Sequence, residues 1–190
     1  MSYTSFLGAC EESKSSSGGV RAAILNDVPV HEMSDSVAVA AQVEHRLYSD
    51  KIEASSFLWG NTNRFQENYH PNYLMDGDPK TTWIEGGTGD GNGEWVRIHT
   101  STIEEATKLR LRLRNGYHKS KDLYGQNARI KELKLRILPG GTTQTILLAD
   151  KMEWLEVQMP LSGGNFEGVT LEIVSTYPGT KYEDTCISDV

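Results

Sequence analysis

Residues 108–114 alternate between a basic side chain and leucine, and this pattern constrains the fold more than any other in the chain. Leu109, Leu111 and Leu113 share one face of an extended segment, and three arginines share the other. A repeat of two residues matches the pleat of a β-strand and not the repeat of a helix. We therefore expect a half-buried strand. Its arginine face can bind an anionic polymer, although solvent and acidic cross-strand partners are its usual surroundings.

Further segments have the length and composition of strands, and turn residues separate them. Proline and glycine at 139–141, serine and glycine at 162–164, and proline and glycine at 178–179 are such turn signals. The expected strands are residues 52–57, 95–100, 108–114, 130–137, 144–149, 153–159, 168–176 and 185–190. Several short strands at this spacing predict an all-β sandwich or jelly roll.

The composition opposes nucleic-acid binding and excludes a membrane-spanning helix. Nineteen Lys and Arg against 26 Asp and Glu leave a formal charge of −7, which opposes binding to nucleic acid. Apolar residues never run for the roughly 18 positions that a membrane-spanning helix needs.

The N-terminal region divides into two parts before the sandwich. Residues 7–10 read Leu-Gly-Ala-Cys, the pattern at which bacterial lipoproteins are cleaved and lipidated, and the Ser- and Gly-rich residues that follow resemble a tether. Residues 1–19 are thus predicted to be a disordered tether with Cys10 as a lipidation site. Met1 to Phe6 lack the basic start and apolar core of a signal peptide, so an extension with a chance cysteine is the alternative.

Residues 20–50 have two interpretations. Ser34 can cap a helix, but Val37 and Val39 also alternate as in a strand, so this extension is a helix or extra edge strands. Residues 51–190 form the predicted β-sandwich. A lipidated N-terminus predicts a bacterial cell-envelope lipoprotein, and an unlipidated one a secreted protein.

Antiparallel strand order predicts where a binding site lies. When successive strands run in opposite directions, alternate connections meet at one end, here residues 85–94, 115–129, 150–152 and 177–184. That end carries four tyrosines with charged and amide groups, a mixture that suits sugar rings and their hydroxyls. The candidate ligand contacts are Trp83, Glu85, Asp90, Tyr117, Lys119, Tyr124 and Tyr182.

The common catalytic motifs are missing from the sequence. Neither H-E-x-x-H nor G-x-S-x-G occurs. The glycines at 86–93 do not have the spacing of a phosphate-binding loop, and Glu85, Asp90 and Glu94 would repel a phosphate. We therefore predict a protein that is not an enzyme.

Several motifs identify a family resemblance. Residues 51–56, 74–83, 85–95, 115–119 and 177–189, which include M-D-G-D-P-K-T-T-W, G-T-G-D-G-N-G-E-W and Y-P-G-T-K-Y, resemble the discoidin-like (F5/8 type C, galactose-binding-fold) domain of bacterial NAD-glycohydrolase toxins. The resemblance implies an eight-stranded jelly roll that binds glycans or glycoproteins without catalysis and assists translocation. The alternatives are a protein-interaction or adhesion domain using the same loops, and an accessory domain of a separate enzyme.

The Asp76-Gly77-Asp78 turn is a candidate calcium site. It fails as an EF-hand, because Thr81 replaces the required glycine and Gly87 the required glutamate. The family resemblance implies a structural calcium ion held by Asp78, Thr81 and Asp189, with carbonyls near Met75 and Lys80. An ordinary Asp-Gly turn is the alternative.

Overall fold

The computed structural model describes residue 49, residues 51–60 and residues 69–190. All of these belong to one compact unit, Glu44–Val190. The predictions for Cys10, for the 1–19 tether and, apart from residue 49, for the 20–50 extension fall outside the described residues. Within the described part, no helix is long and apolar enough to cross a bilayer.

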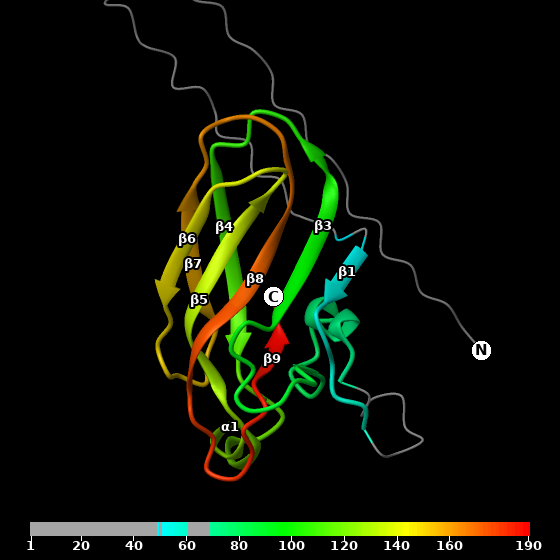
Figure 1. Cartoon of the computed structure of the whole chain (residues 1–190), viewed down its shortest axis with the longest axis vertical. Helices are drawn as coiled ribbons and strands as arrows, with labels where there is room; N and C mark the ends of the chain where they lie inside the picture. Colours follow the sequence, from blue (N-terminus) through cyan, green and yellow to red (C-terminus); the bar gives the residue numbers. More distant parts are fainter. Residues whose placement is uncertain (1–48, 50, 61–68) are drawn as a thin grey trace, which may run out of the picture. The chain divides into compact units, whose positions relative to one another are not determined.

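Two antiparallel sheets make up the sandwich (Figure 1). The larger sheet has the order β1 (Lys51–Ala54), β3 (Trp95–Ile103), β8 (Phe166–Tyr177), β5 (Arg129–Leu138) and β6 (Thr143–Leu147). The smaller sheet has the order β2 (Trp83–Ile84), β9 (Cys186–Asp189), β4 (Lys108–Asn115) and β7 (Leu155–Pro160). The all-β sandwich is therefore confirmed.

The alternation in β4 divides core from solvent as predicted. Leu109, Leu111 and Leu113 are buried, whereas Arg110 and Arg112 are exposed. Buried side chains of the larger sheet complete the same core: Leu133, Leu135, Val169, Leu171 and Ile173. Burial of these apolar side chains is the main free-energy gain of a fold of this size.

The elements that the sequence did not reveal are short. Strand β2 has two residues, which brings the described strands to nine instead of the implied eight. The 3-10 helix η2 (Pro71–Met75) begins where the His70 ring accepts a hydrogen bond from the Asn72 amide at 3.2 Å. Helix α1 (Lys121–Gln126) begins at Ser120, whose hydroxyl accepts from the Leu123 amide at 3.1 Å. Local caps, not hydrophobic periodicity, define both helices.

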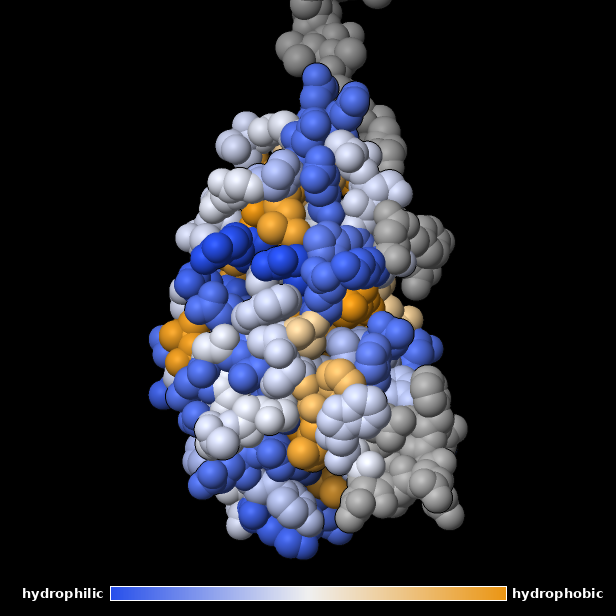
Figure 2. All heavy atoms as spheres, turned by 45° about the vertical axis from the view of Figure 1, so that its right-hand side comes forward, coloured by the Kyte–Doolittle hydropathy of each residue, from blue (hydrophilic) through white to orange (hydrophobic). Residues whose placement is uncertain are grey.

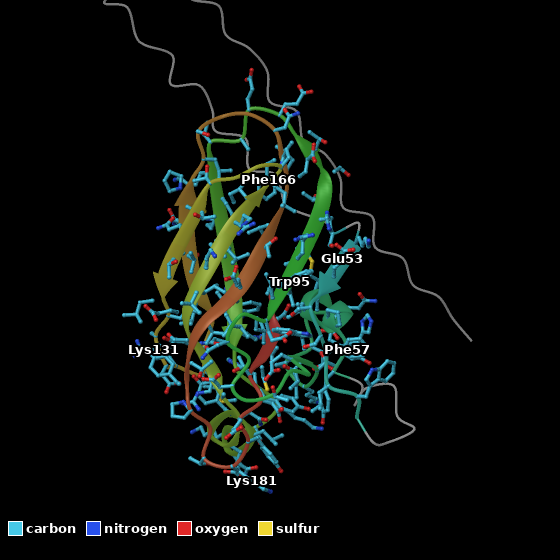
Figure 3. The ribbon with its side chains drawn as sticks, viewed as in Figure 1. Glu53, Phe57, Trp95, Lys131, Phe166 and Lys181 are labelled. Carbon is cyan, nitrogen blue, oxygen red and sulfur yellow. The ribbon has the colours of Figure 1, made fainter. Side chains whose placement is uncertain are left out.

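Several connections meet at one end of the sandwich, which we call the loop end (lower part of Figure 1). The Thr180 amide donates to the Gly125 carbonyl at 3.0 Å and so joins the β8–β9 connection to α1. The Thr185 hydroxyl donates to the Asp90 carbonyl at 2.8 Å and so joins β9 to the β2–β3 loop. Figure 3 shows Lys181 at this end, far along the sandwich from Phe166.

Candidate functional site

A short arm, residues 55–60, carries the most exposed aromatic side chain among the described residues. Trp59 is 71% exposed. Its ring lies 4.8 Å from the Phe57 ring, and Phe57 in turn lies 4.8 Å from the His70 ring. Burial lowers the pKa of His70, so this ring is neutral at pH 7 and packs as an aromatic. The three rings form an aromatic cluster with Trp59 on the water side.

The arm is fixed to the sandwich at Ile84 of β2, which also binds Tyr69. The Leu58 amide donates to the Ile84 carbonyl at 2.9 Å, and the Ile84 amide donates to the Tyr69 carbonyl at 3.4 Å. Gly86 passes so close that a Cβ there would lie 2.6 Å from the Phe57 carbonyl oxygen, which only glycine avoids. The arm therefore lies against the first residues of the β2–β3 loop.

Two serines tie the same arm to the far side of that loop. The Ser56 hydroxyl donates to the Glu94 carboxylate at 2.6 Å, and Ser55 donates to the same oxygen. The Gly86 amide donates to the Ser56 hydroxyl at 2.9 Å.

On the face that carries β1 and the arm, hydrophobic residues reach the surface only in separate patches among hydrophilic ones (Figure 2).

Trp83 was predicted as a ligand contact, and this assignment needs correction. Its side chain is fully buried in the main core. The indole Nε1 donates to the Ser56 carbonyl at 3.0 Å, which satisfies the one polar group of the ring. Strand β2 directs Trp83 inward, so the residue supports the arm and does not present a surface to a ligand.

Glu85 is also buried and shapes the β2–β3 loop from inside. Its carboxylate accepts hydrogen bonds from the amides of Gly87 at 2.7 Å and Thr185 at 3.2 Å. Burial raises the pKa of Glu85, and the negative charges of Asp184 and Glu94 raise it further. Glu85 was predicted as a ligand contact. This is corrected: its buried carboxylate holds the β2–β3 loop in place.

Tyr117 is only 5% exposed, so its ring is not a contact either. It packs with Ile84 and Cys186 in a second small core and meets the Tyr69 ring edge-on at 6.3 Å. The residue follows β4 directly, where the chain turns under the arm. The sequence placed it at the correct end but not on the surface.

Tyr124 lies in a charged hydrogen-bond network. Its hydroxyl donates to the Asp150 carboxylate at 2.9 Å, and Arg129 binds the same carboxylate through Nε at 3.0 Å and Nη2 at 2.6 Å. Burial and Asp150 raise the pKa of Tyr124, and Arg129 lowers the pKa of Asp150. Tyr177 likewise donates its hydroxyl, to the Leu148 carbonyl at 2.9 Å. The hydroxyls of Tyr124 and Tyr177 therefore join neighbouring connections and are already hydrogen-bonded within the chain.

The remaining predicted contacts reach the surface of the loop end. Lys119 is exposed, and Tyr182 is 38% exposed with the Lys181 ammonium 4.8 Å from its ring centre. Asp90 is half-buried, and its carboxylate accepts hydrogen bonds from Thr176 and Asn92. Sequence reasoning missed Trp59. Its signal was a tryptophan directly before Gly60, at the end of the apolar run Phe57-Leu58-Trp59 beyond β1.

Two of the predicted calcium ligands, Asp78 and Thr81, take part in hydrogen bonds within the turn itself. The Asp78 carboxylate accepts from the Lys80 amide at 2.9 Å as in an ordinary turn, and the Thr81 hydroxyl lies 2.8 Å from the Asp76 carboxylate. Asp189 is 4% exposed, and its Oδ2 has no hydrogen-bond partner in the described part of the structure.

A buried carboxylate oxygen without a hydrogen-bond partner is a suitable ligand for a hard cation such as calcium. Burial raises the pKa of Asp189, the positive charge of Arg114 opposes this rise, and the negative charge of Asp76 adds a smaller increase. The described residues contain no group of three acidic, His or Cys side chains suited to a metal. A calcium ion here would thus depend on Asp189, Asp76, the Thr81 hydroxyl and carbonyl oxygens. The Arg114 guanidinium, 3.6 Å from Asp189, would compete with it.

Two antiparallel sheets of five and four strands, with several connections gathered at one end, make up this β-sandwich. Residues 45–190 match the family described as the NAD glycohydrolase translocation F5/8 type C domain. The chain belongs to this family. The comparison with curated protein sequences finds no significant match.

Solved structures are similar to this chain at low sequence identity. Arabinofuranosyltransferase AftD from mycobacteria is 17% identical with a TM-score of 0.52, over 76% of this chain but only 11% of the transferase. The family 32 carbohydrate-binding module of C. perfringens NanJ, solved with galactose, is 12% identical with a TM-score of 0.47, over 73% of this chain and 89% of the module. A chitosan-binding module from Paenibacillus sp. is 14% identical with a TM-score of 0.49, over 76% of this chain and 96% of the module.

The Glu85 carboxyl predicts a specific pH dependence of stability. Because its pKa is raised in the folded state, folding takes up a proton at Glu85, and the resulting stability grows as pH falls from neutral and is lost as pH rises. We expect the gain in free energy of unfolding between about pH 7.5 and 5.5 to be larger for the wild type than for Glu85→Gln. Urea titrations at both pH values measure it. The exposed carboxylate variant Glu153→Gln should behave like the wild type, and equal pH dependence in all three proteins would refute the assignment.

The Asp189 oxygens predict calcium-dependent stability. A cation that binds only the folded state stabilises it by mass action, and at about a hundred times its dissociation constant this raises Tm by about 5 °C for a domain of this size. Thermal unfolding in calcium, in magnesium and in a chelator measures the shift. We expect calcium alone to raise Tm and Asp189→Asn to abolish the shift. An equal Tm in calcium and in chelator would contradict the calcium site, and the charge of Arg114 alone would then balance the charge of Asp189.

Proposed function

We propose that this chain is a non-catalytic glycan-binding module whose sugar contacts are Trp59 of the arm, as the main contact, and residues of the loop end. The observation that carries the proposal is the exposure of Trp59 on an arm that is otherwise hydrogen-bonded to β2 and Glu94. An indole face in water matches the apolar face of a pyranose ring, and polar groups nearby can bind its hydroxyls.

Family membership supports this assignment without settling it. F5/8 type C sandwiches include modules solved with sugars, and the family description names a translocation domain of NAD glycohydrolases. We propose that the chain acts as the binding partner of a separate catalytic unit. Lys119, Tyr182 and Asp90 are proposed as polar contacts at the same end. Since an exposed tryptophan can also anchor a protein interface, a glycan-independent protein ligand is the alternative outcome of the test.

Substitution of Trp59 tests the function directly. We expect Trp59→Ala to lower the affinity for the best neutral oligosaccharide on an array by about tenfold, because the stacking platform is removed. Trp154→Ala is the matched control, since Trp154 is 38% exposed on the outer face of the smaller sheet. Unchanged sugar binding by Trp59→Ala, or equal losses in both variants, would exclude this site.

We also propose a location for the module. The Leu-Gly-Ala-Cys sequence at residues 7–10 supports lipidation of Cys10 and thus a bacterial envelope lipoprotein, with a secreted protein as the alternative. When the chain is expressed in bacteria with its native N-terminus, the wild type should enter the detergent-rich phase in nonionic detergent separation. Cys10→Ser should remain in the aqueous phase. Aqueous wild-type protein would contradict the anchor.

A further inference from the structure

Strand β6 is an edge of the larger sheet, and it pairs with β5 alone. The Leu148 amide donates to the Lys131 carbonyl at 2.8 Å, and the Ile137 amide donates to the Thr142 carbonyl at 3.0 Å. Antiparallel residues alternate between positions that bond to the neighbouring strand and positions that do not. In the described part of the structure, the outward-pointing amides and carbonyls of β6 therefore have no partner strand, and they belong to Thr143, Thr145 and Leu147.

The composition of β6 does not protect this edge. Residues 142–149 read Thr-Thr-Gln-Thr-Ile-Leu-Leu-Ala and contain neither a charged residue nor a proline. Leu147 is 68% exposed, and among the described large hydrophobic side chains only Trp59 is more exposed. Edge strands that do not pair with another chain are commonly protected by lysine, proline or an inward-pointing charge. The edge at β6 has none of these and is suited to accept another strand.

The other edge strands differ from β6 in this respect. Strand β1, at the opposite edge of the same sheet, has Lys51 and Glu53 among its four residues. Strand β7, at the edge of the smaller sheet, contains Glu156 and ends at Pro160. An uncharged edge is therefore a particular property of β6 and not of the fold.

The sandwich is open beside β6. A cavity of about 360 Å³ lies between β6 and β7, which lie on the same side of the molecule (left in Figure 1). Apolar side chains of both strands line it, among them Ile146 and Val157. Because Leu148 is buried and side chains alternate along a strand, Gln144 and Ile146 point to this inner side. A strand added to β6 would thus extend the sheet and cover the cavity with its own inner side chains.

We propose that this added strand is β6 of a second copy of the chain, so that two copies form a symmetric dimer with one continuous sheet. A two-fold axis at Thr145 places Thr145 opposite the same residue of the second copy and Thr143 opposite Leu147. All the outward-pointing residues of β6 then lie in hydrogen-bonded pairs, which provide about six backbone hydrogen bonds. The interface is the same patch on both copies, as a two-fold axis requires.

The charges beside β6 favour its own copy as the partner. On the outer face of β5, Glu132 and Arg136 are the neighbours of the two ends of β6. The two-fold axis at Thr145 therefore puts Glu132 of one copy and Arg136 of the other in the same cross-strand row. Lys134, in the row of the axis, is already paired with Glu172 at 3.2 Å. Uncharged side chains face each other directly, and no like charges oppose the pairing.

Charge substitutions at the proposed axis test the dimer. Thr145→Lys and Thr145→Glu each place two like charges opposite each other, so each should raise the dissociation constant of its dimer at least about tenfold. An equimolar mixture of the two variants should recover the dimer, because opposite charges then face each other. Sedimentation velocity of the full-length chain over a concentration series measures this. Every protein also carries Cys10→Ser, so that neither a lipid nor a disulfide at Cys10 links the copies.

Thr102→Lys is the matched control. Thr102 is an exposed threonine of β3, which β8 and β5 separate from β6, so this variant should dimerise like the wild type. Urea unfolding curves confirm that each variant is folded. A wild type that stays monomeric up to about 1 mM overturns the proposal, and so does a dimer that neither charge at Thr145 weakens. A mixture that fails to recover the dimer overturns the axis at Thr145. No sugar enters the measurement, so the dimer and the glycan-binding function succeed or fail independently.

Discussion

The constraint on which the structure depends is the pleat of β4, which sends leucines inward and arginines outward in one short segment. Three buried leucines fix the smaller sheet against β5 and β8 of the larger one. A shift of one residue would exchange the two faces and bury the arginines, so the register is strongly determined. The register of β4 determines its pairing with β7 and β9, and this pairing determines where each connection lies.

The loop end depends on contacts between residues far apart in sequence, such as Ser56 with Glu94 and Glu85 with Thr185. The stacking of Arg112 on Trp154 depends instead on the pairing of β4 with β7.

The sequence predicted what alternation and turn residues encode, namely the strands, the sandwich and the end where the connections meet. It did not predict which side chains of that end face water. Trp83 and Glu85 flank the last residue of β2, where their orientation is decided by pairing with β9, 100 or more residues later in the chain. Tyr117 lies in a small core against which Leu58 of the arm and Tyr69 also pack. The same tertiary arrangement exposes Trp59, whose neighbours in sequence carry no strong pattern.

The hydrogen bond from the Trp83 indole to the Ser56 carbonyl links the buried core to the arm next to Trp59. The backbone beside Trp59 is therefore already ordered, so the proposed sugar ligand would cost little conformational entropy of the arm on binding. Weakening this hydrogen bond would lower the proposed affinity without removing any atom that touches the ligand.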